Sequence, residues 1–309
     1  MKNKPTVTIG IPTYRSPDMM PLVLKSLLKQ KTRDVKILEI IVYSDGNIDD
    51  NTVKNCRKVI GNNKIVKIID AKVRHGMAYG FKYMLSIFKG DIFVLLNDDI
   101  KITDNYLIEK LIKPLINDQK IGLVGGNTVP LPAKNFFQKA YLSSFNAYRR
   151  TGYLLNNGHN KNTCDGAILA ISRNLIKKIK FPKKDGDLGC VDIYMYIQTL
   201  RNKFKYYFAR NAIIYFNLAS NHEDLVSRFS RNNSNIYLLK NQFGDIVENE
   251  HNITKTNHSK SMFIEFVKNP IGSLYIFIVA KYSEHKSKSI AKNFDPTWKV
   301  IESTKKINT

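Results

Sequence analysis

The sequence predicts an α/β fold in which helices flank a mostly parallel central sheet and a C-terminal helical appendage follows. Short apolar runs alternate with segments of helical periodicity over the first 125 residues, and this alternation is typical of a parallel sheet covered by helices. The 309 residues are 43% hydrophobic and 11% aromatic, which excludes a disordered basic tail. The length allows one large domain with an appendage.

Strands are expected where a short apolar run, rich in β-branched residues, ends at a polar or turn residue. These runs are Val7–Ile11, Ile37–Tyr43, Ile65–Ile69, Ile92–Leu96 and Ile121–Val124. Between them, apolar residues recur at three- and four-residue spacing. This spacing predicts helices over 18–30, Asp49–Ile60, Met77–Phe88 and 104–116. Because Ile92–Leu96 is apolar throughout, we expect it to be buried on both faces of the sheet.

The patterns are weaker in the second half of the chain. Residues 130–165 contain prolines and aromatic side chains without a clear period, so we expect a loose segment there. Residues 165–217 regain regular structure, and the pattern over 222–243 indicates a helix. We therefore predict one domain over 1–250 and a helical, Lys-rich appendage over 251–309.

The charge of the chain leaves several kinds of partner open. There are 49 Lys and Arg against 26 Asp and Glu, a net charge of +23. This charge suits nucleic acid, anionic lipid or a phosphorylated substrate, and equally Lys residues that only solvate the surface. The 3 Cys exclude a disulfide scaffold and show no metal-ligand spacing. No signal-peptide core and no apolar run of about 20 residues is apparent, so we expect a cytoplasmic protein.

Polar residues follow the first, second and fourth predicted strands. The segments are Pro12-Thr13-Tyr14, Ser44-Asp45-Gly46 and Asn97-Asp98-Asp99. In sheets of this kind, ligands bind at the carboxyl ends of the strands. Mg²⁺ or Mn²⁺ prefers one or two carboxylates together with phosphate oxygens. Acidic strand ends therefore indicate a site for a metal and a polar ligand, although Asn and Asp are also common in plain turns.

Three segments in this order resemble family 2 glycosyltransferases: VTIGIPTYRSPDMMPLVLKSLLKQ, LEIIVYSDGNIDDNT and RHGMAYGFKYMLSIFKGDIFVLLNDD. The resemblance extends over about residues 1–240. It implies the nucleotide-diphospho-sugar transferase fold, called GT-A, which is Rossmann-like. The residues that it implies for nucleotide binding are Pro12, Thr13, Tyr14 and Asp45. Among them, Asp45 matches the family's Asp that contacts the base. His75-Gly76 matches the family's segment before the third helix and is expected to bind substrate.

The same resemblance assigns the metal. Asn97-Asp98-Asp99 stands where the family has its metal-binding DXD motif, so Asp99 would bind Mg²⁺ or Mn²⁺. Asn97 replaces the first Asp and would offer a carbonyl oxygen, at the cost of one negative charge. Asp98 would serve the sugar or the ribose.

The second half is similar to the family's acceptor side. Asp165-Gly166-Ala167 resembles the Gly-rich acceptor loop. The resemblance makes Asp192 the catalytic base, although Val191 stands where the family has Glu. The alternative for Asp192 is an acid that only stabilises the first turn of a helix.

Arg228 and Arg231 are three residues apart on a predicted helix, so both guanidinium groups share one face. Such a pair suits a diphosphate, because Arg binds phosphate through two donors at once. A solvated basic face is the alternative.

The implied function is inverting transfer of a hexosyl group from a nucleotide sugar, with UDP as the expected nucleotide, to a glycan or lipid-linked acceptor. Asp192 would act as general base and the metal at Asp99 would serve the leaving diphosphate. The alternatives are an inactive homologue that only binds sugar nucleotides, because of Asn97 and Val191, and a basic nucleic-acid-binding protein. No nucleic acid is expected as partner, since acids at strand ends would repel phosphate without a metal.

The appendage has two interpretations. Its apolar part, 262–282, could pack on the domain or lie in a membrane interface, and the tail over 281–306 holds seven Lys against three acidic residues. We therefore expect that peripheral contact with the inner face of a membrane, if made, involves residues 262–306.

Overall fold

The computed structural model describes residues 4–46, 51–184, 188, 190–292, 295, 297 and 299–306. Its strands are β1 (Thr6–Thr13), β2 (Lys36–Ser44), β3 (Val66–Asp70), β4 (Ile92–Leu96), β5 (Ile100–Lys101), β6 (Ile121–Pro130), β7 (Ile168–Ser172) and β8 (Lys205–Phe216). Its α-helices are α1 (Met19–Leu27), α2 (Thr52–Ile60), α3 (Met77–Ile87), α4 (Leu107–Asn117), α5 (Phe136–Leu154), α6 (Arg173–Ile176), α7 (Val191–Arg201), α8 (His222–Phe243), α9 (Asp245–Lys268) and α10 (Pro270–Lys292). A short 3₁₀ turn, η4 (Glu302–Thr304), follows them.

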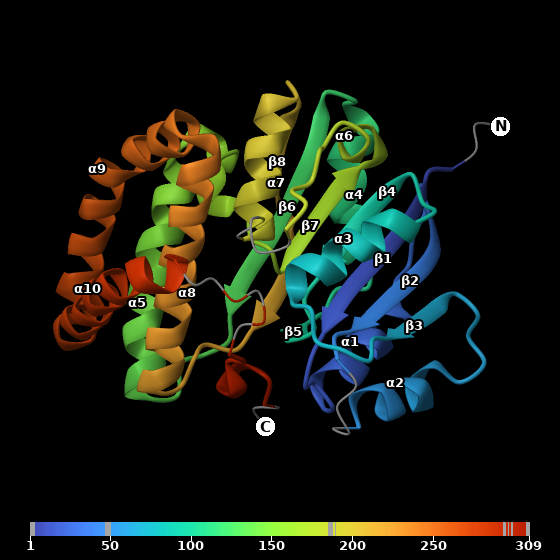
Figure 1. The fold of residues 1–309 in the computed structure, drawn as a ribbon, viewed down its shortest axis with the longest axis horizontal. Coiled ribbons are helices and arrows are strands. Elements are labelled where there is room, and N and C mark those ends of the chain that lie inside the picture. The colour runs from blue at the N-terminus through green and yellow to red at the C-terminus, as the bar shows by residue number, and fades with distance from the viewer. Residues whose placement is uncertain are drawn as a thin grey trace.

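The strands form one 8-stranded sheet in the order β3-β2-β1-β4-β7-β6-β8-β5 (Figure 1). Strands β3, β2, β1 and β4 pair in parallel, as do β6 and β8. Strand β7 runs antiparallel to both of its neighbours, β4 and β6. Leu96, at the end of β4, therefore pairs with Ile168, at the start of β7. As a result, the residues that follow β4 and those that precede β7 meet at one edge of the sheet.

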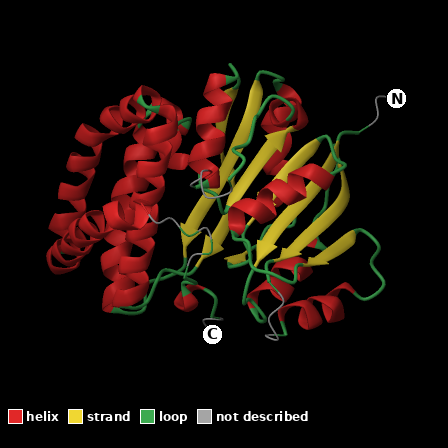
Figure 2. Cartoon of the chain, viewed as in Figure 1, coloured by secondary structure: helices red, strands yellow, loops and turns green. Residues whose placement is uncertain are grey.

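Apolar side chains cover both faces of the sheet, and Figure 2 shows helices in front of and behind the strands. On one face, Ile9 of β1 belongs to a fully buried cluster with Leu24 of α1 and Leu111 of α4. On the other, Phe81 of α3 and Tyr194 of α7 belong to a second cluster. Strand β4 is buried over its whole length, which confirms the prediction for Ile92–Leu96. The α/β class and the mostly parallel sheet are confirmed as well.

One segment differs from its prediction. Residues 130–165 are not loose, because α5 runs there for 19 residues. The buried face of α5 includes polar side chains, among them Gln138, Arg149 and Thr151. An apolar stripe is the usual mark of a helix in a sequence, so this helix carried no clear signal.

The helix expected from Asp49 begins at Thr52, and its first two expected residues lie outside the described part of the chain. The helix expected over 222–243 is α8, with these bounds.

Helices α9 and α10 lie beside the sheet, together with α5 and α8, at the left of Figure 1. Ile276 and Val279 of α10 are buried, and Glu265 of α9 forms an ion pair with Arg150 of α5 at 2.5 Å. The appendage therefore packs on the domain through one of its faces. Because α9 begins at Asp245, the predicted boundary at residue 250 falls inside a helix, and the division into domains stays a prediction. No helix among the described residues is both long enough and apolar enough to cross a bilayer.

Candidate active site

The end of β2 is tied to the loop before α3 through Asp45. His75 N donates to Asp45 Oδ1 at 2.7 Å, and Gly76 N donates to Oδ2 at 2.8 Å. Gly76 has a φ of 92°, a conformation that glycine adopts without steric strain. Asp45 thus fixes the start of α3, and its expected contact with a base stays a prediction.

The end of β1 is tied to the end of β4. Thr13 Oγ1 donates to Asp98 Oδ2 at 2.7 Å, and Tyr14 N donates to the same oxygen at 3.3 Å. The guanidinium of Arg74 lies over the Tyr14 ring, 3.9 Å from its centre, at cation–π distance. Half-buried Pro12 precedes them in β1. These residues form the side of the site that we expected to bind the nucleotide.

Asp98 and Asp99, which we call the acid pair, follow β4 directly. Asp98 is buried and Asp99 is half-buried. Burial and the charge of Asp98 raise the pKa of Asp99 above its ordinary value. Asn97 is half-buried too, and its backbone N–H donates to the carbonyl of Ala167 at 3.1 Å.

A segment near the C-terminal end, residues 301–306, reaches the acid pair. Lys305 Nζ lies 2.8 Å from Asp98 Oδ2 and also donates to the carbonyl of Tyr14. Thr304 Oγ1 donates to Asp99 Oδ2 at 3.0 Å. The acid pair is therefore contacted by the ammonium group of Lys305, which lies 207 positions from Asp98 in the sequence.

Asp192 begins α7 and faces the loop before β7. Gly166 N donates to Asp192 Oδ2 at 3.1 Å, and Ile193 N donates to Oδ1 at 2.8 Å. Burial, and then the charge of Asp165, raise the pKa of Asp192. A carboxylate held in this way accepts a proton more readily than one in water, which is the property of a general base.

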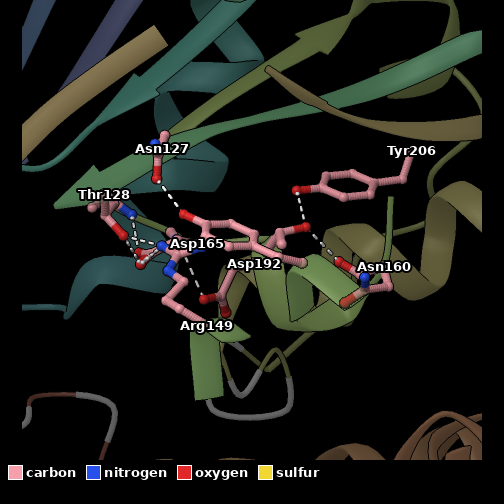
Figure 3. A network of polar contacts seen from close by, with 11 residues as sticks. Asn127, Thr128, Arg149, Asn160, Asp165, Asp192 and Tyr206 are labelled. Carbon is pink, nitrogen blue, oxygen red and sulfur yellow. Dashed lines mark hydrogen bonds and ion pairs between the residues drawn. The ribbon is translucent and has the colours of Figure 1, made fainter. Parts of the chain in front are cut away.

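Asp165 joins a network of polar contacts that Figure 3 shows. Thr128 Oγ1 donates to Asp165 Oδ2 at 2.9 Å, and Arg149 Nη2 lies 3.2 Å from the same oxygen. Arg149 is 5% exposed. Its Nε and Nη1 make no hydrogen bond to any residue that the structure describes. Since unpaired buried donors are costly, these two mark a place for a polar or anionic ligand beside Asp165.

Arg228 and Arg231 of α8 lie within electrostatic range of the same acids. Arg228 interacts electrostatically with Asp165 and Asp99, and Arg231 interacts with Asp99 and Asp192. Burial, and then repulsion from Arg228, lower the pKa of Arg231 to about 10. We call the set Asp98, Asp99, Asp165 and Asp192 the acidic edge. The two arginines interact with Asp99, which follows β4, and with Asp165 and Asp192, which lie by the loop before β7.

The acid pair has few protein ligands for a metal. Among the described residues, no group of three or more His, Cys, Asp or Glu side chains is placed to hold an ion. Mg²⁺ and Mn²⁺ do not need such a group, because they keep waters and take oxygens from substrate phosphates. Of the described residues, Thr304 alone donates to Asp99, and only to Oδ2. Asp99 with Asn97 therefore fits a hard cation that binds together with a diphosphate.

Three site residues gave no signal in the sequence: Arg149, Thr304 and Lys305. Arg149 lies in the helix that was expected to be loose, and the other two lie in a tail whose Lys content indicated only surface or lipid contact. Val191, which stands where the family has Glu, is 4% exposed and packs in the core. Its contribution here is to packing.

Comparison with known proteins bears on the family and the fold. The model of the family described as "Glycosyl transferase family 2" matches residues 8–180. No curated protein sequence matches the chain.

Many solved structures share the fold. A mannosyltransferase from Pyrobaculum calidifontis, in complex with GDP-Man and Mn²⁺, has a TM-score of 0.61 and 15% identity, over 94% of this chain and 84% of that one. Glucosyl-3-phosphoglycerate synthase from Mycobacterium tuberculosis, in complex with Mn²⁺, UDP and phosphoglyceric acid, has a TM-score of 0.55 and 17% identity, over 78% of this chain and 79% of that one. At these identities the likeness shows the fold, which is GT-A. Because the family model matches more than half of a chain with this fold, the chain belongs to glycosyl transferase family 2.

Proposed function

We propose that this protein is an inverting hexosyltransferase that moves a sugar from a nucleotide-diphospho-sugar, with UDP as the nucleotide, to an acceptor hydroxyl. One observation carries the proposal: Asn97 N donates to the carbonyl of Ala167 at 3.1 Å, and the neighbouring Gly166 N donates to Asp192 Oδ2 at 3.1 Å, so the backbone holds the two acid sites side by side. A diphosphate bound at Asp99 and an acceptor bound at Asp192 would therefore be neighbours, with the charge of Arg231 acting on both acids.

Asp192 is the proposed general base. It would take the proton from the acceptor hydroxyl as that oxygen bonds to the anomeric carbon and the bond to the diphosphate breaks. The raised pKa of Asp192 supports this role. Its two backbone hydrogen bonds, from Gly166 and Ile193, would hold the carboxylate in place while the acceptor binds.

Arg228 and Arg231 are proposed to bind the leaving diphosphate, because guanidinium groups bind phosphate oxygens through two donors. Asp99 and Asn97 would hold Mg²⁺ or Mn²⁺, which supplies further positive charge to the diphosphate. The leaving group then needs no proton, so a single base is sufficient. The family's nucleotide contacts at Pro12, Thr13 and Tyr14 remain part of the proposal.

A donor panel tests this function. Purified protein is heated with UDP-, GDP- and dTDP-sugars, with and without Mn²⁺, and its unfolding temperature is recorded. A rise of several degrees with a UDP-sugar and Mn²⁺, together with Mn²⁺-dependent hydrolysis or transfer, is the expected result. Binding without any turnover would favour the inactive homologue. Stabilisation by nucleic acid alone would contradict the proposal.

The proposal includes contact with an anionic membrane through α9 and α10. Large apolar side chains are exposed on both sides of the turn that joins these helices: Phe263, Ile264, Phe266, Val267, Ile271, Leu274, Phe277, Ile278 and Tyr282. On α10 they recur at helical spacing, and the opposite face is buried through Ile276 and Val279. Exposed Lys268 and Lys281 lie next to these residues in the sequence, and each pairs with a glutamate, Glu265 at 3.8 Å and Glu284 at 3.1 Å. Exposed apolar side chains beside lysines suit a helix that lies in an anionic lipid interface.

Vesicles test the membrane contact. Protein should sediment with vesicles of phosphatidylcholine and phosphatidylglycerol at low salt, and less with phosphatidylcholine alone. Ile271→Asn and Phe277→Asn should weaken sedimentation. Leu22→Asn, which changes an exposed apolar residue of α1, should not. Sedimentation that is equal in all three variants, or a stable dimer in light scattering, would overturn this part of the proposal.

A further inference from the structure

Residues 301–306 are attached to the domain independently of the acid pair. Asn217 Nδ2 donates to the carbonyl of Thr304 at 3.1 Å and to the carbonyl of Lys306 at 3.0 Å. The side chain of Ile301 is buried in the cluster that joins α5, α8 and α10. These contacts hold the backbone on both sides of Lys305 against the domain.

The segment also reaches the acid pair from the α8 side of the molecule. Ser303 Oγ donates to Asp224 Oδ2 at 2.5 Å, and Ser220 N donates to Ser303 Oγ at 3.1 Å. Asp224 lies in the first turn of α8, the helix that carries Arg228. The segment is therefore joined to the helix that we propose to bind the diphosphate.

Lys305 lies at the place where the family comparison leads us to expect a cation. Its side chain is 15% exposed, and the side chain of Asp98 is 8% exposed. The Nζ–Oδ2 distance of 2.8 Å is that of a charge-assisted hydrogen bond. The ammonium charge also favours the ionised form of Asp99. One tethered cation thus compensates part of the charge on both acids.

We propose that Lys305 is a built-in counter-ion of the donor site, which occupies the acid pair in the ligand-free protein and gives way when a divalent cation binds with the nucleotide diphosphate. Two cations close to one carboxylate pair repel each other, so Lys305 and the divalent ion are alternatives there. Residues 301–306 then border the donor site, and their contact with the acid pair changes when the metal binds. The inference rests on the proposed function, because it takes Asp99 of the acid pair as a metal ligand.

Mn²⁺ binding without nucleotide tests the competition. The free ion is followed by electron paramagnetic resonance in titrations of the unchanged protein, Lys305→Gln and Lys306→Gln. Lys306 is the matched control, because its side chain is exposed and the same charge is removed one residue away. Lys305→Gln should bind Mn²⁺ about tenfold more tightly, the effect of removing a competing charge in a partly buried site. Lys306→Gln should change the affinity by less than about twofold. Equal or weaker Mn²⁺ binding by Lys305→Gln would overturn the proposal.

A second variant and a second measurement guard against a folding defect. Lys305→Arg keeps the charge and should keep the weak Mn²⁺ affinity of the unchanged protein. In the unchanged protein, the amides of Thr304 and Lys305 donate within the segment, to Ile301 and Glu302. Their hydrogen exchange should become several-fold faster with Mn²⁺ and UDP. Slower or unchanged exchange would contradict displacement.

The outcomes separate this inference from the proposed function. If the unchanged protein and Lys305→Gln both fail to bind Mn²⁺ with UDP, the proposed metal site is wrong and the inference fails with it. If both bind Mn²⁺ equally and transfer sugar, the proposed function stands and Lys305 is not a competing counter-ion.

Discussion

Two carboxylates at opposite ends of the sheet, buried Glu39 and half-buried Asp192, differ in how their charges are compensated. Glu39, near the start of β2, is 3% exposed and is surrounded by donors. It accepts hydrogen bonds from Thr8 Oγ1 at 2.9 Å and Lys89 N at 2.8 Å, and it pairs with Lys67 Nζ at 2.6 Å. Burial opposes the charge of Glu39, yet these donors hold its pKa below the ordinary value.

Asp192, at the acidic edge, shows the opposite balance. It accepts two backbone N–H groups, from Gly166 and Ile193, and the negative charge of Asp165 acts on it. Its pKa is raised. The difference teaches that burial alone does not decide the role of a carboxylate. At the amino end of the sheet, hydrogen-bond donors and Lys67 compensate the charge of Glu39, which stabilises the fold. At the acidic edge, Asp192 keeps a charge that a proton or a cation can still compensate.

The sharpest way to test this contrast is to remove the charge of Asp192. Asp192→Asn should lower kcat by about 10²–10⁴-fold, the usual contribution of a general base, while UDP binding stays unchanged. Steady-state kinetics and calorimetric titration with UDP measure the two effects. Glu39→Gln is the control from the other end of the sheet, and its activity per folded molecule should equal that of the unchanged protein. Full activity of Asp192→Asn would remove Asp192 from the mechanism.

The matching change at the amino end should affect folding. Glu39→Ala leaves Thr8, Lys89 and Lys67 without their acceptor and should lower the free energy of unfolding by about 3 kcal/mol. Lys67→Ala should cost less, about 1 kcal/mol, because the Lys67 side chain is 47% exposed. Urea unfolding measures both. If the two variants lose equal stability, or neither loses any, Glu39 is not the compensated charge that we describe.

The arginines should matter for the donor and little for the fold. Arg231→Gln should weaken UDP-sugar binding about tenfold, the typical loss of a charge-assisted hydrogen bond. Because the pKa of Arg231 is lowered to about 10, donor binding by the unchanged protein should fall as the pH rises through that value. Arg201→Gln, at the exposed end of α7, is the control. A donor affinity that does not depend on Arg231 would place the diphosphate elsewhere.

The smallest expected effect is a gain in stability at the acidic edge. A raised pKa in the folded state means that ionising Asp192 costs stability, so this cost is absent at pH values below the unfolded pKa and is complete above the folded one. Asp192→Asn removes the ionisation and should raise the free energy of unfolding by about 1 kcal/mol at neutral pH. The gain should shrink as the pH is lowered through the pKa of Asp192. For Glu39 we expect the opposite sign. Because its pKa is lowered, the ionised carboxylate of Glu39 stabilises the folded protein at neutral pH, and this stabilisation is lost as the pH falls through that lowered pKa. Unfolding curves across acidic and neutral pH distinguish the two signs.

The sequence predicted the part of the site that follows strands. The run Ile92–Leu96 is apolar throughout and stops at Asn97, so both the strand and the position of the acid pair could be read from the pattern. The same holds for Thr13 at the end of β1 and Asp45 after β2. Short local patterns are sufficient to predict these positions, because ligands bind at the carboxyl ends of the strands and the residues there directly follow each strand.

The residues that the sequence did not reveal depend on contacts between distant parts of the chain. Arg149 lies in α5, where the buried side chains are partly polar and no apolar stripe marks the helix. Lys305 looks like any other Lys of a basic tail, and only the folding of residues 301–306 onto Asn217 brings it to Asp98. No local pattern encodes a contact across 207 positions.

The position of Lys306 has a practical consequence for work with this enzyme. Three further residues, 307–309, follow it in the sequence, so a fusion attached after Thr309 would begin five positions beyond the lysine that contacts the acid pair. The other end of the chain is better placed: Thr6 opens β1, and the amino end of β1 lies at the edge of the sheet opposite to Asp98. An affinity tag or a fluorescent protein at the N-terminus should therefore leave nucleotide titrations undisturbed, and the same tag at the C-terminus should not.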